Sequence, residues 1–139
     1  MDKEVLSAKL ESLRRCVQRI RDKTPPSAAV LLKDHDLQDI ICLNIERSVQ
    51  ICVDLASHII AESDLTAPTT MRQSFDQLHR LGLISEELAV RIKKAIGFRN
   101  IAVHAYQEIN WEIVYAIITS RLEDFVEFAR AVSNAADLP

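Results

Sequence analysis

The sequence predicts an all-α protein, an antiparallel bundle of four to five helices in one domain that spans residues 1–139. Three observations lead to this prediction. Only two glycines and four prolines occur among 139 residues, so turns are few and the segments between them are long. Apolar residues recur at spacings of three and four in those segments, which is the period of a helix. No segment of useful length alternates polar and apolar residues, as a half-buried strand would.

The two longest predicted helices in the first half of the chain follow one another closely. The first covers residues 2–22 and ends before the segment TPPS, because proline lacks a backbone N–H donor and clashes with the preceding turn. The second covers residues 35–62, and its apolar stripe is wide enough for the central helix of a bundle. That stripe consists of Leu37, Ile40, Ile41, Ile45, Val49, Cys52, Leu55, Ala56, Ile59 and Ile60.

Capping residues and apolar periodicity in the second half of the chain predict further helices joined by short connections. Thr69 or Thr70 caps a short helix over residues 70–81. Ser85, followed by two glutamates, begins a helix that runs through the segment LAVRIKKAIGFRN. The last helix covers residues 110–134. Together with the two helices of the first half, we expect it to supply the core, since these three have the longest apolar stripes.

Composition and charge exclude several classes of protein. The net charge is −3, so no overall positive field attracts nucleic acid, and such contact needs a local basic patch. The three cysteines, Cys16, Cys42 and Cys52, match no zinc or redox spacing, so we expect free thiols in a reducing cytosol. The first ten residues lack the apolar core of a signal peptide, and no apolar run is long enough to cross a bilayer. A cytoplasmic protein without membrane contact is expected.

The common cofactor and metal motifs are missing from the sequence. It contains no P-loop, no HExxH pattern and no GxSxG elbow. His35, Asp36 and Asp39 lie at helical spacing, and we interpret them as solvated residues near a helix start instead of metal ligands. His58 follows an apolar segment, so we expect it to be partly buried and hydrogen bonded. We therefore expect neither a metal nor a cofactor.

One segment carries polar side chains that an apolar helix does not require. RNIAVHAY, residues 99–106, contains Arg99, Asn100, His104 and Tyr106. At about 100° per residue, Asn100 and His104 share one face of a helix, while Arg99 and Tyr106 share another. Arg99 and His104 lie about 140° apart, so one regular helix cannot bring both to the same substrate atom. Either the helix breaks between residues 99 and 106, or two copies of the motif face each other in a dimer.

These side chains suit cleavage of RNA without a metal. Histidine gives or takes a proton near neutral pH, and arginine forks onto phosphate oxygens. The ribose 2′-hydroxyl would attack the neighbouring phosphate, with His104 moving the proton and Arg99 stabilising the added negative charge. Asn100 offers an amide that holds a base, a phosphate or the imidazole. A local basic patch for RNA is supplied by Arg91, Lys93 and Lys94.

On spacing alone, a purely structural interpretation of the same residues stays open. An arginine and a histidine five residues apart occur together in many helices. In that case His104 is buried and hydrogen bonded to a backbone carbonyl, and Arg99 lies in a surface ion pair.

The longer segment FRNIAVHAY resembles the R-x4-H-x-Y signature of HepT-type toxins, a branch of the HEPN superfamily. Arg99, His104 and Tyr106 occupy the signature positions, and Asn100 is also present. The resemblance covers nearly the whole chain. The segment ERSVQICVDLASHII resembles the second helix of the family, and YQEINWEIVYAII resembles the entry to its last helix.

The resemblance implies a HEPN-like dimer in which two motifs form one cleft, with Arg99 and His104 as catalytic residues of a metal-independent endoribonuclease. It also implies the toxin of a bacterial toxin–antitoxin pair. The antitoxin of such a pair is typically a MntA-like nucleotidyltransferase, which silences the toxin by attaching AMP to the tyrosine, here Tyr106. The attached nucleotide brings bulk and negative charge two residues from His104.

Two other functions fit these features. One is a non-catalytic HEPN adaptor or substrate-binding subunit that pairs with a nucleotidyltransferase. The other is a structural dimerisation module whose polar motif only specifies the interface. The presence of Arg99, His104 and Tyr106 together favours the nuclease, because a pure adaptor does not need all three. Growth arrest on expression, abolished by changing His104, separates the nuclease from both alternatives.

Overall fold

The computed structural model describes residues 2–138, and every regular element in that range is a helix, with no strand. The all-α class is therefore confirmed, although the number of helices is larger than the four to five expected. The elements are α1 (Lys3–Lys23), α2 (Ala28–Lys33), α3 (His35–Ala61), α4 (Met71–Arg80), α5 (Glu86–His104), the short 3-10 helix η1 (Tyr106–Glu108), α6 (Trp111–Ser120) and α7 (Glu123–Ala135).

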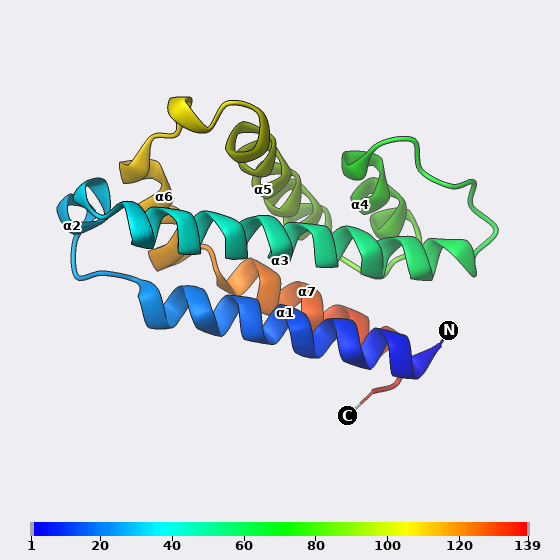
Figure 1. The fold of residues 1–139 in the computed structure, drawn as a ribbon. Helices are drawn as coiled ribbons and strands as arrows, with labels where there is room; N and C mark the ends of the chain where they lie inside the picture. Colours follow the sequence, from blue (N-terminus) through cyan, green and yellow to red (C-terminus); the bar gives the residue numbers. More distant parts are fainter. Residues whose placement is uncertain (1, 139) are drawn as a thin grey trace.

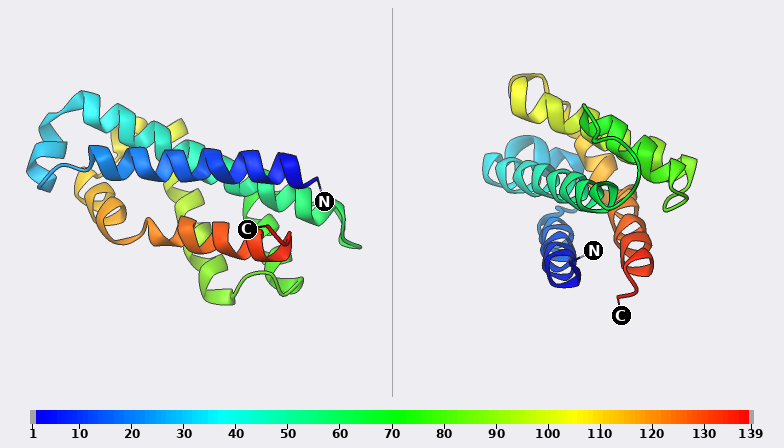
Figure 2. Two further views of the ribbon diagram at one scale, coloured as in Figure 1. Left: turned by 90° about the horizontal axis from the view of Figure 1, so that it is seen from below. Right: turned by 90° about the vertical axis from the view of Figure 1, so that its right-hand side faces the viewer.

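The long helix α3 lies at the centre of the molecule (Figure 1). Helices α1 and α7 pack against one side of it and against each other, while α4 and α5 cover the opposite side. Helix α6 packs on the short helix α2 at the end where the chain turns from α1 into α3 (Figure 2). This arrangement leaves the C-terminal end of α5 and the η1 turn on the outer surface.

Side-chain caps explain where the predicted helices begin. At the start of α3, the Asp34 carboxylate accepts a hydrogen bond from the Leu37 amide. The Thr70 hydroxyl accepts a hydrogen bond from the Gln73 amide before α4. The Ser85 hydroxyl accepts one from the Leu88 amide before α5. The bounds of α1, α3 and α4 agree with the predicted ranges to within one residue.

The core is centred on α3, and α1, α6 and α7 contribute to it as expected. Helix α5 was not expected in the core, yet it buries more apolar side chains than α1 or α7 alone. Phe75 of α4 and Phe128 of α7 are fully buried and meet edge to face, with ring centroids 5.7 Å apart. The central helix contributes the largest set of buried apolar side chains, which is Ile41, Cys42, Ile45, Val49, Cys52, Leu55, Ala56, Ile59 and Ile60. Between residues 2 and 138, no helix is long and apolar enough to span a membrane.

The predicted helix at 110–134 is wrong in one respect, because the chain bends at Arg121 and Leu122 and forms two helices. The hydroxyls of Thr119 and Ser120 donate to backbone carbonyls three and four residues earlier, a contact that often bends helices. The two halves also pack on different neighbours, α6 on α2 and α7 on α1 and α5. One straight helix would not make both sets of contacts.

The short helix α2 was not predicted, because six residues after two prolines give too little apolar periodicity to detect. Ser27 caps its start, and Leu31 is buried. The buried amide of Gln38 donates to the Leu31 carbonyl at 2.9 Å, which ties α2 to α3. Tertiary contacts of this kind stabilise a helix that is too short to be stable alone.

Candidate functional site

The motif lies at the C-terminal end of α5, which runs without a break from Glu86 to His104. Arg99 and His104 therefore project from one regular helix about 140° apart. A helix break between these two residues is excluded, because the helix ends only at Ala105, whose backbone has φ −146° and ψ 51°. The prediction that Tyr106 continues the helix and shares a face with Arg99 is wrong, because Tyr106 begins η1.

The side chains of Asn100 and His104 are exposed on the same face of α5, one turn apart. Arg99 is half-buried, and its Nη1 lies 3.4 Å from the Asn100 side-chain oxygen. The structural interpretation of the motif is wrong on both points for residues 2–138. His104 is neither buried nor bonded to a backbone carbonyl there, and Arg99 forms no ion pair with an acidic side chain.

Large apolar side chains flank His104 on the surface. Ile101 is 44% exposed and Val103 is 46% exposed, and both belong to the last turn of α5. The two side chains project to opposite sides of the helix, so one lies on each side of the His104 face. This end of the helix therefore combines the motif with surface that a second protein surface would bury.

Helix α4 adds a cation to this face of α5, which the sequence did not indicate. Gly97 lies one turn before Asn100, and a Cβ atom at position 97 would come 3.2 Å from Arg72 Nη2. The guanidinium of Arg72 thus lies directly over the backbone of α5. Within residues 2–138, Arg72 has no ion pair with an acidic side chain. Its charge is therefore available on the side of the helix that carries Asn100 and His104.

The basic patch expected from Arg91, Lys93 and Lys94 is largely neutralised. Arg91 donates to Asp124 and to Glu127 of α7, both at 2.8 Å. Lys93 donates to Asp76 of α4 at 2.7 Å. Lys94 is exposed. These ion pairs join segments that are distant in sequence, so the pattern of charges along the chain could not reveal them.

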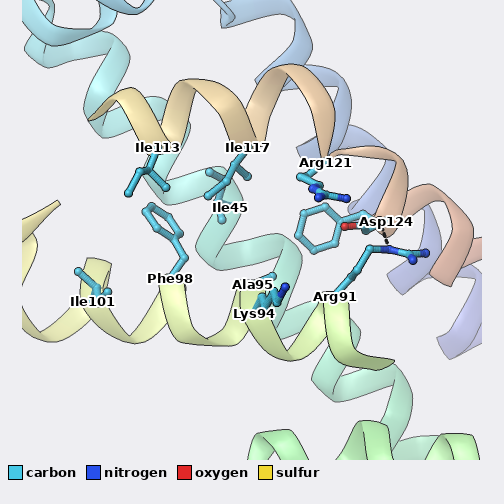
Figure 3. A pocket seen from close by; sticks show the side chains of 11 residues that line it. Ile45, Arg91, Lys94, Ala95, Phe98, Ile101, Ile113, Ile117, Arg121 and Asp124 are labelled. Atoms are coloured by element: carbon cyan, nitrogen blue, oxygen red, sulfur yellow. Dashed lines mark hydrogen bonds and ion pairs between the residues drawn. The ribbon is translucent and has the colours of Figure 1, made fainter. Parts of the chain in front are cut away.

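An apolar cleft of about 350 Å³ lies on a different side of α5, between α5 and α6 (Figure 3). Phe98 of α5 and Ile113 of α6 point toward each other across it, and the Arg91–Asp124 ion pair lies at one end. Phe98 and Asn100 are two residues apart and so project to opposite sides of the helix. The residues that line the cleft do not include Arg99, Asn100 or His104. The polar side chains of the motif therefore lie outside this cleft, although Ile101 of the same segment lines it.

Tyr106 is held in place by two contacts from different helices. Its hydroxyl donates a hydrogen bond to Asp39 Oδ1 of α3 at 2.7 Å. Its ring meets the edge of Trp111, the first residue of α6, with centroids 5.8 Å apart. Partial burial and the hydrogen bond to Asp39 raise the pKa of the Tyr106 hydroxyl well above its usual value. The phenol is therefore protonated at neutral pH and still 39% exposed.

The histidine and acidic side chains of α3 differ in part from what the sequence predicts. His58 is exposed on α3, so the expectation of a partly buried histidine is wrong, because the last turns of α3 have solvent on that side. In the described part of the chain, no three His, Cys, Asp or Glu side chains are grouped closely enough to hold a metal ion. Asp39 is solvated as expected, but its contact with Tyr106 was missed because 67 positions separate them.

Comparison with known proteins places most of the chain, including the motif, in one family. The family model described as ribonuclease HepT-like matches residues 13–132. The chain belongs to the HepT-like ribonuclease family. The mRNA nuclease HepT of Shewanella oneidensis is 37% identical to it over 125 residues, which cover 90% of this chain and 93% of the relative. The tRNA nuclease HepT of Aphanizomenon flos-aquae is 22% identical over 130 residues, 94% of this chain and 88% of the relative.

Solved structures agree with membership of the HepT-like family. The tri-AMPylated HEPN toxin of Shewanella oneidensis, solved in complex with MNT antitoxin, superposes with a TM-score of 0.89 at 35% identity, over 96% of this chain and 99% of that one. YutE of Bacillus subtilis, a cytosolic protein of unknown function, superposes with a TM-score of 0.84 at 12% identity, over 99% of this chain and 92% of that one. The second likeness shows the fold alone.

Proposed function

We propose that this HepT-like ribonuclease is the toxin of a bacterial toxin–antitoxin system and cleaves RNA without a metal ion. Residues 1–139 form one HEPN-like domain, and two copies form the active dimer in the cytoplasm. The observation that carries the proposal is the position of Arg99 and His104 on one unbroken helix whose end is exposed. One copy holds these side chains apart, and a second copy brings an arginine and a histidine together.

The dimer is proposed to form through the end of α5, where residues 95–106 include the motif. Ile101 and Val103 supply apolar surface beside His104 for the partner copy to bury. In a two-fold symmetric dimer the same helix faces its own copy, so both motifs line one cleft. Arg99 of one copy and His104 of the other then reach the same phosphate.

In that cleft the reaction follows from the chemistry of the two side chains. The ribose 2′-oxygen bonds to the adjacent phosphorus, and the bond from phosphorus to the 5′-oxygen breaks. His104 transfers the proton that the reaction requires, and Arg99 stabilises the negative charge that grows on the phosphate oxygens. The products are a 2′,3′-cyclic phosphate and a free 5′-hydroxyl. Asn100, next to Arg99, holds the guanidinium or the RNA by its amide.

RNA contacts outside the reacting phosphate are proposed for Arg72 and Lys94. Both are exposed, and Arg72 lies over Gly97 on the motif side of α5. Arg91 and Lys93, which the sequence also suggested, are engaged by acidic side chains, so we assign them a smaller part in binding. Each phosphate contact by a cation adds to affinity and makes binding salt-dependent.

A MntA-like nucleotidyltransferase antitoxin is proposed to silence the enzyme by attaching AMP to Tyr106. The acceptor hydroxyl follows His104 by two residues and is partly exposed, so an attached nucleotide reaches the cleft. The added phosphate is negatively charged and competes with RNA for Arg99. The tri-AMPylated state of the Shewanella oneidensis toxin, 35% identical to this chain and solved with MNT antitoxin, supports AMP transfer as the means of silencing.

The decisive experiment incubates the purified protein with total RNA in the presence of EDTA, beside the His104→Ala variant. We expect cleavage by the wild type, fragments that end in 2′,3′-cyclic phosphate, and no cleavage by the variant. If the variant cleaves as fast as the wild type, His104 is not catalytic. If neither protein cleaves RNA but both bind a nucleotidyltransferase, the adaptor function replaces the nuclease.

A further inference from the structure

The hydrogen bond between Tyr106 and Asp39 has no role in the silencing reaction as proposed above. The Tyr106 hydroxyl is the donor, and the Asp39 carboxylate of α3 accepts it at 2.7 Å. Hydrogen bonds from a hydroxyl to a charged carboxylate are short and stronger than bonds between neutral groups. The proton that must leave Tyr106 during AMP transfer is therefore already directed at a base that belongs to this chain.

We propose that Asp39 is the catalytic base of AMP transfer to Tyr106, so that the toxin supplies part of the chemistry of its own silencing. This inference rests on the proposed function. In the step, the Tyr106 oxygen bonds to the α-phosphorus of ATP, the bond from that phosphorus to the bridging oxygen of the β-phosphate breaks, and pyrophosphate leaves. The phenol proton moves to Asp39 Oδ1, which lies within the distance required for direct proton transfer.

A base is needed because the hydroxyl does not ionise by itself. Partial burial, the Asp39 hydrogen bond and the nearby side chains of Cys42, Asp39 and Glu46 all raise the pKa of Tyr106. A neutral phenol is a weak nucleophile, and an adjacent general base activates it as the bond to phosphorus forms. Asp39 is exposed and has no other hydrogen-bond partner among the described residues, so its carboxylate is free to accept the proton.

A second contact of the Tyr106 ring bears on whether Asp39 acts as a base or only anchors the ring. The T-shaped contact with Trp111 also positions the Tyr106 ring at the start of η1, so the hydrogen bond to Asp39 is not the sole anchor of this side chain. After AMP is attached, the tyrosine oxygen has no proton to donate. Once Asp39 has released the transferred proton to solvent, its negative charge faces the new phosphodiester, and this repulsion directs the nucleotide away from α3.

The test measures AMP transfer in single-turnover reactions of the full chain with its cognate nucleotidyltransferase, magnesium and ATP labelled at the α-phosphate. Peptide mapping locates the label on Tyr106. The variants are Asp39→Asn, which keeps an acceptor oxygen but not a base, and Asp39→Glu, which keeps the carboxylate. Asp36→Asn removes the same charge one turn earlier on α3 and is the matched control. Thermal unfolding of each variant verifies the fold.

We expect Asp39→Asn to lower the rate constant of transfer at saturating ATP by about 100-fold, the effect of losing a general base. The KM for ATP should stay near the wild-type value, Asp39→Glu should recover most of the rate, and Asp36→Asn should match the wild type. An undiminished rate for Asp39→Asn would place the base in the antitoxin and overturn the proposal. Equal losses for Asp39→Asn and Asp39→Glu would make Asp39 an anchor only, and would also overturn it.

A separate outcome concerns the proposed function itself. If the wild-type chain takes up no label, the assignment of Tyr106 as an AMP acceptor fails, and the role of Asp39 fails with it. RNA cleavage by the unmodified wild type is measured in parallel, so that loss of the silencing mechanism is distinguished from loss of the nuclease assignment.

Discussion

Two inactive variants of this protein should restore each other when they share a dimer. The perturbation combines Arg99→Ala in one copy with His104→Ala in the other. On α5 the two positions are separated by about 140° around the helix and by roughly 7.5 Å along it. A copy that lacks Arg99 still offers His104 from its own helix, and the other copy offers Arg99.

The expected activity follows from the number of sites that contain both Arg99 of one copy and His104 of the other. Each variant alone forms dimers that lack one of the two side chains in both copies, and we expect these dimers to be inactive. When equal amounts of the two variants pair at random, about half of the dimers contain one copy of each variant. A mixed dimer has one complete Arg99–His104 pair, where the wild-type dimer has two. About a quarter of the wild-type rate should therefore return. If Arg99 and His104 acted within one copy, no mixed dimer would contain a complete pair.

The assay follows cleavage of a fluorescent RNA after the two variants are unfolded together in mild denaturant and refolded. Differently tagged copies allow the mixed dimers to be quantified by sequential affinity purification. The control refolds each variant alone at the same total concentration. Mixed dimers that are present in the expected amount but show no activity above the separate variants would refute the shared cleft.

Three further predictions address the same region of the molecule. Gly97→Ala should raise the free energy of unfolding by about 0.5–1 kcal/mol, because alanine is the better helix former. The same change should weaken RNA binding, because the added Cβ displaces Arg72. Thermal melts test the stability and RNA titrations at several salt concentrations test the binding, and a lower melting temperature would contradict the predicted gain in stability. Tyr106→Phe should keep most of the RNA cleavage but gain no AMP when incubated with ATP, magnesium and the antitoxin, as read by intact mass; equal labelling of both proteins would place the acceptor elsewhere. Burial raises the pKa of the Cys42 thiol to about 12, so iodoacetamide at pH 8 should alkylate the half-buried Cys16 well before Cys42 in the native protein; mass spectrometry of a time course decides the order.

The helical class and most helix bounds could be predicted because the forces behind them are local. The spacing of apolar side chains in α1 and α3 reports the helical period directly, and the caps Thr70 and Ser85 bond to amides three residues later. The bend at Arg121 was not predictable from periodicity, because it depends on which neighbours α6 and α7 contact. The helix α2 is stable only through contacts with α3 and α6.

The sequence by itself determined the candidate residues of the site, because Arg99, Asn100, His104 and Tyr106 fall within one segment of eight and their chemistry follows from residue type. It also determined that Arg99 and His104 diverge, provided that the segment is a regular helix. Only the tertiary structure decided that the helix is unbroken to His104, that Arg72 lies over Gly97, that Arg91 is engaged by α7, and that Asp39 holds the Tyr106 hydroxyl. The physical reason is that helix periodicity and capping act over three or four residues, whereas these contacts join helices that are far apart in the chain and meet only when the core packs.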